Sequence, residues 1–128
     1  MQHVNTRLSR VDKIYHIADV HIRNLHRHSE YSLVFERLYK YIEETRTPNS
    51  LIYLGGDIVH AKLDMSPELI RMVYDFFNRL SELCEVVLIT GNHDCNLNNL
   101  HRLDALEPIV NALNTHSIHY LKDTGVYR

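Results

Sequence analysis

The chain has 128 residues, a net charge of −2 and a composition that is 45% hydrophobic and 23% charged, which suits one globular domain over residues 1–128. This balance excludes nucleic-acid binding by bulk charge alone, and no apolar run is long enough to cross a membrane. The first ten residues lack the apolar region of a secretory signal, and the two cysteines make no disulfide framework. We therefore expect an intracellular protein, in the cytoplasm or with the nucleoid or nucleus.

The first predicted elements are a strand and a helix that follow a flexible lead-in over residues 1–11. Residues 11–18 are predicted as the strand, because apolar side chains recur there ahead of a polar loop. The helix should begin near Ser29, a favourable N-cap residue, and end near Thr45. Its expected buried positions recur at helical spacing and are Val34, Leu38, Tyr41 and Ile42.

The second strand and helix have clearer boundaries. Residues 51–54 form a short apolar run that is typical of a strand buried on both faces, and Gly55 and Gly56 end it. The run Ser66-Pro67-Glu68 combines a cap residue, a proline suited to the first helical position and an acid in the first turn, which predicts a helix start. The buried side chains of that helix are expected to be Leu69, Val73, Phe76 and Leu80.

The last third of the chain continues the same alternation. A third strand is predicted over residues 85–90, and a third helix over about residues 100–107. Pro108 should end or kink this helix, because proline lacks the amide that an interior helical position uses. A fourth strand is expected over residues 117–121, and residues 123–128 have the composition of a hairpin turn.

Strands and helices thus alternate throughout, which predicts an α/β fold with a mostly parallel sheet. In such sheets, functional loops lie at the carboxyl ends of the strands. Three polar motifs occupy those ends, namely Asp19-Val20-His21, Gly56-Asp57-Ile58-Val59-His60 and Gly91-Asn92-His93-Asp94. Because they follow adjacent predicted strands, the motifs should converge on one spot.

The residue types in these motifs indicate a metal centre. Asp19 and His21 are two apart, which in an extended segment puts both side chains on one face. Asp57 offers two oxygens that could bridge two metals, and Asn92 offers a neutral carbonyl oxygen. A pair of metals held in this way can activate a water and stabilise in-line displacement at phosphorus.

The remaining polar residues suit acid–base work on a phosphoester. His93 could donate a proton to the leaving oxygen, and Asp94 could orient the His93 ring. His60 is placed to touch a phosphate oxygen.

The order of motifs DxH, GDxxH and GNHD resembles that of the calcineurin-like metallophosphoesterase family, over about residues 13–112. Within the family, the chain most resembles SbcD-type DNA repair and recombination nuclease subunits. Phage and viral recombination endonuclease subunits share the same features. The segments that carry this likeness are Ile17–His21, Gly56–His60 with the Ser66-Pro67 helix start, and Ile89–Asp94.

The resemblance implies the N-terminal half of a four-layer metallophosphoesterase sandwich, and a DNA exo- or endonuclease subunit that hydrolyses phosphodiesters. It implies two divalent metal ions, which would be Mn²⁺ or else Fe or Zn. It also implies a coiled-coil ATPase as partner subunit and no association with a membrane. The implied metal ligands are Asp19, His21, Asp57 and Asn92. The implied catalytic residues are His93, His60 and Asp94, with His60 also contacting the substrate.

The family's later motifs, an isolated histidine and a closing Gly-His-x-His, are not found, since His101, His116 and His119 stand in another context and are expected at the surface. We therefore expect the N-terminal half of a longer protein, or a truncated relative. Two alternatives to the nuclease stay open. One is a phosphatase on the same scaffold, which the near-neutral charge favours. The other is a non-catalytic scaffold with a partial metal site, whose uncovered sheet would need a partner or form a homodimer.

Overall fold

The computed structural model describes residues 1–25, 27–60, 65–91 and 106–128. Over these ranges the elements are β1 (Lys13–Ile17), α1 (His28–Thr45), β2 (Ser50–Leu54), α2 (Pro67–Leu83), β3 (Glu85–Ile89), α3 (Glu107–Leu113) and β4 (Ile118–Leu121). In that part of the chain, no helix combines the length and the apolar character that crossing a membrane requires.

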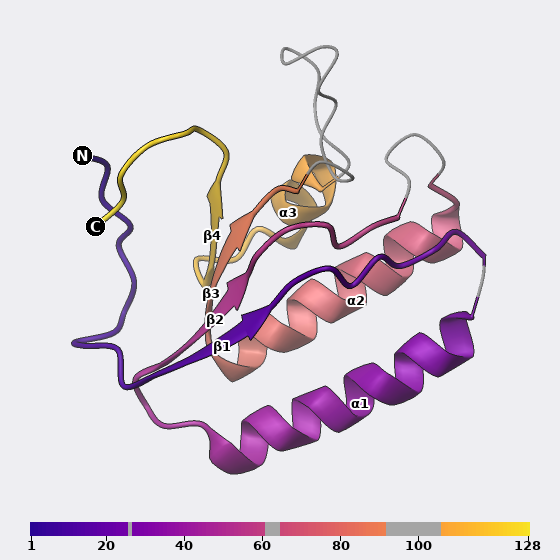
Figure 1. Cartoon of the computed structure of the whole chain (residues 1–128), viewed down its shortest axis with the longest axis horizontal. Coiled ribbons are helices and arrows are strands. Elements are labelled where there is room, and N and C mark those ends of the chain that lie inside the picture. Colours follow the sequence, from indigo (N-terminus) through magenta and orange to yellow (C-terminus); the bar gives the residue numbers. More distant parts are fainter. Residues whose placement is uncertain (26, 61–64, 92–105) are drawn as a thin grey trace.

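The strands form one parallel sheet in the order β1-β2-β3-β4. Tyr15, Ile52, Val86 and Ile118 are register partners from one strand to the next across it. Since every crossover steps in the same direction, right-handed connections place the helices on one face of the sheet. Figure 1 shows α1 and α2 running along that side. The predicted α/β alternation with a parallel sheet is confirmed, and the carboxyl ends of β1, β2 and β3 lie at one edge.

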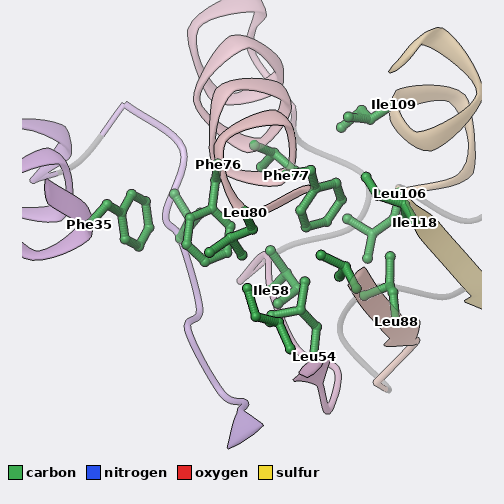
Figure 2. Packing of buried hydrophobic residues seen from close by; sticks show 14 of the residues in the cluster. Phe35, Leu54, Ile58, Phe76, Phe77, Leu80, Leu88, Leu106, Ile109 and Ile118 are labelled. Atoms are coloured by element: carbon green, nitrogen blue, oxygen red, sulfur yellow. The ribbon is translucent and has the colours of Figure 1, made fainter. Parts of the chain in front are cut away.

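The hydrophobic core lies between this face of the sheet and the helices. Figure 2 shows Phe76 and Leu80 of α2 above the strand residues Leu54 and Leu88, and all four side chains are fully buried. Phe35 of α1 closes the cluster, with its ring centroid 4.3 Å from that of Phe76. Removing such large apolar side chains from water is the main source of folding free energy. All four positions of the stripe predicted for α2 are fully buried, so this prediction is confirmed.

Helix α1 buries only part of its predicted stripe, since Ile42 is buried and Leu38 is half-buried against the core. Its buried residues are Phe35, Tyr39 and Ile42. The predicted positions Val34 and Tyr41 are instead 57% and 58% exposed. Both stripes have helical spacing, so the sequence pattern alone could not choose between them. Phe76 of α2 makes the choice, because the rings of Phe35 and Tyr39 pack against it.

Strand β2 also differs from its prediction, because helices cover only one face of the sheet. Ser50, Ile52 and Leu54 are buried, whereas Leu51 and Tyr53 on the opposite face are half-buried. The strand is therefore not fully buried on both faces. Its alternating burial is the pattern expected where only one face is covered.

The start of α2 agrees with the sequence, and the start of α1 does not. The Ser66 hydroxyl accepts a hydrogen bond from the Leu69 amide at 3.1 Å, and the Ser66 amide donates to Oδ1 of Asn24 at 2.9 Å. Ser66 is thus the N-cap of α2, as predicted. In α1 the position before the helix is Arg27, which makes no side-chain cap, and the predicted cap Ser29 lies inside the first turn.

We expect Ser66→Ala to lower the free energy of unfolding by about 1 kcal/mol, the typical value of an N-cap hydrogen bond. Ser29→Ala is the matched control, and it should change that free energy by less than about 0.5 kcal/mol. Urea unfolding followed by circular dichroism measures both. Equal effects of the two substitutions would contradict the assignment of Ser66 as the cap.

Helix α3 begins where the sequence predicted a helix to end. It spans Glu107–Leu113, and Pro108 stands in its first turn. Amides of a first turn have no partner within the helix, so proline there removes no hydrogen bond. The prediction was that Pro108 ends or kinks a helix, whereas in the described residues it stands at the start of one. The predicted helical residues 100–105 lie outside the described residues.

The segment predicted as a flexible lead-in has specific partners. The Gln2 amide donates to the Val126 carbonyl at 2.9 Å, and the Arg128 amide donates to the Gln2 carbonyl at 2.8 Å. Gln2 and Tyr127 form a parallel bridge. Residues 126–128 are thus joined to the start of the chain. The segment predicted as a hairpin turn, residues 123–128, pairs with Gln2 in a parallel bridge.

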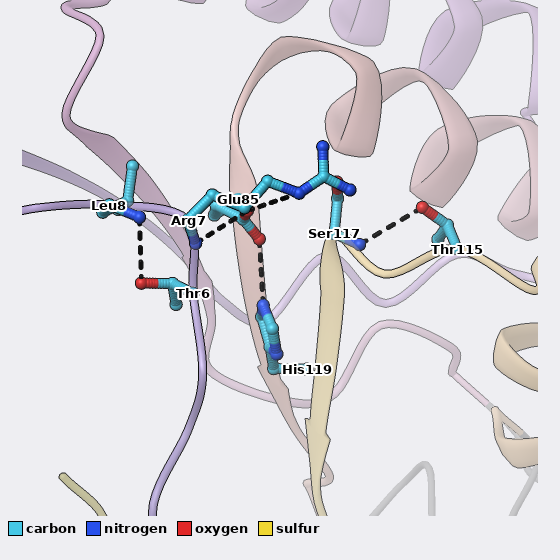
Figure 3. Close-up of polar contacts among 7 residues, drawn as sticks. All are labelled: Thr6, Arg7, Leu8, Glu85, Thr115, Ser117 and His119. Carbon is cyan, nitrogen blue, oxygen red and sulfur yellow. Dashed lines mark hydrogen bonds and ion pairs between the residues drawn. The ribbon is translucent and has the colours of Figure 1, made fainter.

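A buried carboxylate holds the lead-in at a second place, at the amino end of β3. Figure 3 shows Glu85 between Arg7 and His119. The Arg7 amide donates to Oε1 of Glu85 at 3.2 Å, and Nε2 of His119 lies 2.9 Å from Oε2. Glu85 is 8% exposed and His119 15% exposed. His119 was predicted at the surface, but β4 carries it against a buried carboxylate that needs a polar partner. His116 is exposed as predicted, and His101 lies outside the described residues.

Candidate metal centre

The loops after β1 and β2 are joined along the carboxyl edge of the sheet. The Asp19 amide donates to the Gly56 carbonyl at 3.1 Å, and the His21 amide donates to the Asp57 carbonyl at 2.9 Å. A parallel bridge between Ile22 and Val59 continues this pairing. The first two polar motifs are therefore held side by side by backbone hydrogen bonds.

Three residues of these motifs have a left-handed backbone. The φ angles are 55° at Asp19, 51° at His21 and 54° at Asp57. This region is uncommon for residues other than glycine and persists where surrounding contacts enforce it. The hydrogen bonds between the loops are such contacts. The prediction that Asp19–His21 is extended was therefore wrong. The two side chains do lie close together, but left-handed backbone at both residues, not the alternation of a strand, brings them there.

The side chains of Asp19, His21 and Asp57 form a compact donor cluster, whose candidate ligand atoms all lie within 4.8 Å of one another. Nε2 of His21 is 3.6 Å from Oδ1 of Asp19 and 3.9 Å from Oδ2 of Asp57. Ligands that each lie ~2.1 Å from one ion are roughly 3–3.5 Å apart. The two distances from His21 are only slightly wider than this, so an inward shift of these side chains would let them share an ion.

The donor types fit a borderline divalent metal. Two carboxylates with one imidazole suit Mn, Fe or Zn, whereas soft metals prefer thiolates and Ca²⁺ prefers oxygen alone. The Asp57 side chain is 16% exposed and forms the base of the cluster, while the Asp19 side chain is 76% exposed and faces solvent. The cluster is therefore open on one side, where a substrate could reach it. Ligation by these residues stays a prediction.

Two glycines allow the loops after β2 and β3 to touch. A methyl group on Gly91 would overlap the carboxylate of Asp57 and would lie 2.5 Å from the Asp57 amide nitrogen. A methyl group on Gly56, whose φ is 94°, would lie 2.5 Å from the Gly91 amide nitrogen. The sequence showed that these glycines end strands, but it did not show that Gly91 is the surface on which Asp57 rests.

His60 lies at the margin of the cluster. Its ring centroid is 5.9 Å from that of His21, and the two planes are tilted by 57°. The His60 amide donates to the Ile22 carbonyl at 3.0 Å, which fixes the backbone beside the first motif. The His60 side chain is exposed. It stands next to the cluster without belonging to its three donors, and the predicted contact with a phosphate stays a prediction.

Of the third motif, Gly91-Asn92-His93-Asp94, the structure describes only Gly91. Gly91, which touches Asp57, directly precedes Asn92, His93 and Asp94 in the sequence. Those three residues lie outside the described residues, so the predicted amide ligand and the predicted acid–base pair remain predictions. The structure brings together the three other predicted ligands.

One residue that sequence reasoning missed also touches the site. The Tyr31 hydroxyl, on α1, donates a hydrogen bond to the His21 carbonyl oxygen at 2.8 Å. No motif or spacing marks Tyr31, because this contact depends on where α1 packs against the sheet.

Known proteins similar to the chain include members of one enzyme family. Residues 12–126 match the family described as calcineurin-like phosphoesterase. The chain is 51% identical over 117 residues to the uncharacterized protein R555 of Acanthamoeba polyphaga mimivirus, across 90% of this chain and 9% of that protein. It is also similar to the crystal structure of the Pseudomonas putida nuclease MPE, with a TM-score of 0.56 and 25% identity, across 88% of this chain and 49% of that one.

The chain thus spans about half the length of the bacterial nuclease and less than a tenth of the viral protein. The narrower likeness to SbcD-type subunits stays a prediction. The family match extends over nearly the whole sequence. It includes every described strand and helix, and the donor cluster at the carboxyl edge of the sheet. The chain belongs to the calcineurin-like phosphoesterase family.

Proposed function

We propose that the chain forms part of the active site of a metal-dependent phosphodiesterase and that its substrate is DNA. The observation that carries this proposal is the cluster of Asp19, His21 and Asp57, with donor atoms within 4.8 Å of one another. The family is one of divalent-metal-dependent hydrolases. The 25% identity to a bacterial nuclease supports a nucleic-acid diester as the substrate.

The proposed ligands divide between two ions. Asp19 and His21 would hold the first, Asp57 would bridge with its two carboxylate oxygens, and Asn92 would hold the second. Asp57 suits the bridging role because it lies between the loop after β1 and the loop after β3. Mn²⁺ is the proposed metal, with Fe and Zn as alternatives for this donor set. When bound, the ions would activate a water and neutralise charge on the phosphate.

The other polar residues of the motifs would handle protons and the phosphate. His93 would protonate the leaving oxygen, and Asp94 would hold the His93 ring in orientation. His60 would contact a phosphate oxygen, which its exposed position beside His21 supports.

Further parts of the proposal rest on the resemblance in the motifs. They are a role in DNA repair or recombination inside the cell, and either a coiled-coil ATPase subunit or a second copy of the chain as partner. Co-purification and sizing of the full chain would test these partners.

Hydrolysis by the full chain, stripped of metal and then titrated with MnCl₂, tests the proposed function. Labelled duplex DNA, bis-(4-nitrophenyl) phosphate and 4-nitrophenyl phosphate serve as substrates. We expect Mn²⁺-dependent cleavage of DNA and of the diester, and His21→Gln should slow cleavage by about 10²–10³-fold, because a lost ligand removes several kcal/mol of charge stabilisation. Asp75→Asn is the control, since this exposed carboxylate on α2 pairs only with Arg71 among the described residues.

The substrate panel also separates the alternatives. Preferred cleavage of the monoester would favour a phosphatase, a function that the net charge of −2 supports because DNA-binding surfaces are usually basic. Metal binding without hydrolysis of any substrate would overturn the enzymatic proposal and favour a non-catalytic subunit.

A further inference from the structure

The contact between Tyr31 and the first polar motif links helix α1 to the donor cluster. The Tyr31 hydroxyl donates to the His21 carbonyl oxygen at 2.8 Å. The Tyr31 ring is half-buried and lies 6.0 Å from the ring of Phe35, which in turn packs on Phe76. The hydroxyl is therefore held in place by the hydrophobic core rather than by an exposed loop.

The hydrogen bonds around His21 fix its backbone from both sides. Its amide donates to the Asp57 carbonyl at 2.9 Å, and its carbonyl accepts from Tyr31. Between these two bonds the residue has a φ of 51°, a conformation that a non-glycine residue keeps only under constraint. This backbone conformation directs Nε2 of His21 toward Asp19, at 3.6 Å, and Asp57, at 3.9 Å.

We propose that Tyr31 is a positioning residue for His21, whose hydroxyl keeps the imidazole at the donor cluster and thereby raises the affinity of the site for a divalent metal. Loss of the hydroxyl removes the hydrogen bond that Tyr31 donates to the His21 carbonyl oxygen. The left-handed conformation then relaxes in part of the molecules, and a metal must use some of its binding free energy to restore it. The inference rests on the metal-binding part of the proposed function and does not depend on hydrolysis.

Tyr31→Phe tests this role, because it removes the hydroxyl and leaves the ring packed. Tyr41→Phe is the matched control, since Tyr41 lies on the same helix and is 58% exposed. We expect Tyr31→Phe to weaken binding of Mn²⁺ or Co²⁺ about 3- to 10-fold, the effect of one hydrogen bond, as measured by calorimetry. Tyr41→Phe should leave affinity unchanged.

Two further measurements distinguish positioning from general stability. The visible spectrum of the Co²⁺-loaded protein, which reports the geometry of the ligands, should change in Tyr31→Phe and not in Tyr41→Phe. In a His21→Gln background, adding Tyr31→Phe should weaken metal binding by less than twofold, because the residue being positioned is absent.

Each outcome has a distinct meaning. Unchanged affinity and spectrum in Tyr31→Phe would overturn the positioning role alone, as would an equal loss of affinity in both backgrounds. A wild-type chain that binds metal but hydrolyses nothing would overturn the nuclease proposal and leave the role of Tyr31 intact. A wild-type chain that binds neither metal would overturn both.

Discussion

Replacing Asp57 by alanine is expected to remove metal binding at the donor cluster and to lower phosphodiester hydrolysis by on the order of 10³-fold or more. Asp57 is the most buried donor of the cluster, with Nε2 of His21 3.9 Å from its carboxylate and Gly91 packed against it. Loss of an outer-shell partner of a metal ligand typically costs 10–100-fold in affinity, so loss of the proposed bridging ligand should cost more.

Asp57→Asn separates charge from shape in the same experiment. The amide keeps the size of the side chain and one oxygen, but it removes the negative charge that two cations would share. Calorimetry with Mn²⁺ should show weaker binding than in the wild type for both substitutions, and weaker binding for alanine than for asparagine. Asp75→Asn, which changes an exposed carboxylate on α2, should bind and hydrolyse as the wild type does. If Asp57→Ala retained wild-type affinity, the cluster would not be the metal centre.

Replacing Gly91 by alanine is expected to damage the same site without altering any proposed ligand. The added methyl group would occupy the space of the Asp57 carboxylate and would lie 2.5 Å from the Asp57 amide nitrogen, so the carboxylate must move and the backbone of one of the two loops must shift as well. We expect Mn²⁺ affinity to fall at least about tenfold, since the proposed bridging ligand Asp57 is displaced. Overpacking of this kind also destabilises a fold by about 1–3 kcal/mol, which thermal unfolding of the metal-free protein would show.

Gly125→Ala is the matched control for Gly91→Ala. A methyl group on Gly125 would meet nothing closer than Nε2 of Gln2 at 3.7 Å, an ordinary contact distance. This variant should keep wild-type stability within about 0.5 kcal/mol and wild-type metal affinity. Equal behaviour of the two alanine variants would show that the close approach of Gly91 to Asp57 has no part in metal binding.

The order of elements and the helix α2 could be predicted from the sequence because their signals are local. The cap at Ser66 and the stripe that includes Val73 and Phe76 depend on residues within a few turns of one another. The stripe of α1 could not be predicted in the same way. Two candidate stripes have the same spacing, and the partner that selects one of them, Phe76, comes from another helix.

Proline and histidine show the same limit. Pro108 either ends a helix or begins one, and the choice depends on which neighbouring segment packs on the sheet; in the structure it begins α3. His119 was predicted at the surface, because its buried partner is far from it in the sequence. Its partner Glu85 is supplied by the neighbouring strand β3, so the contact exists only once β4 pairs with β3.

The sequence by itself determined that Asp19, His21 and Asp57 follow parallel strands and would therefore meet, because the side on which a parallel strand ends follows from topology alone. It also determined the donor types, carboxylates and an imidazole, which are groups that divalent metals bind. Only the tertiary structure decided how the donors face one another. Left-handed backbone at all three residues, the bare surface of Gly91 beneath Asp57 and the hydroxyl of Tyr31 on His21 are contacts between segments distant in the chain. They depend on ångström-scale distances between packed elements, which no local pattern of residues encodes.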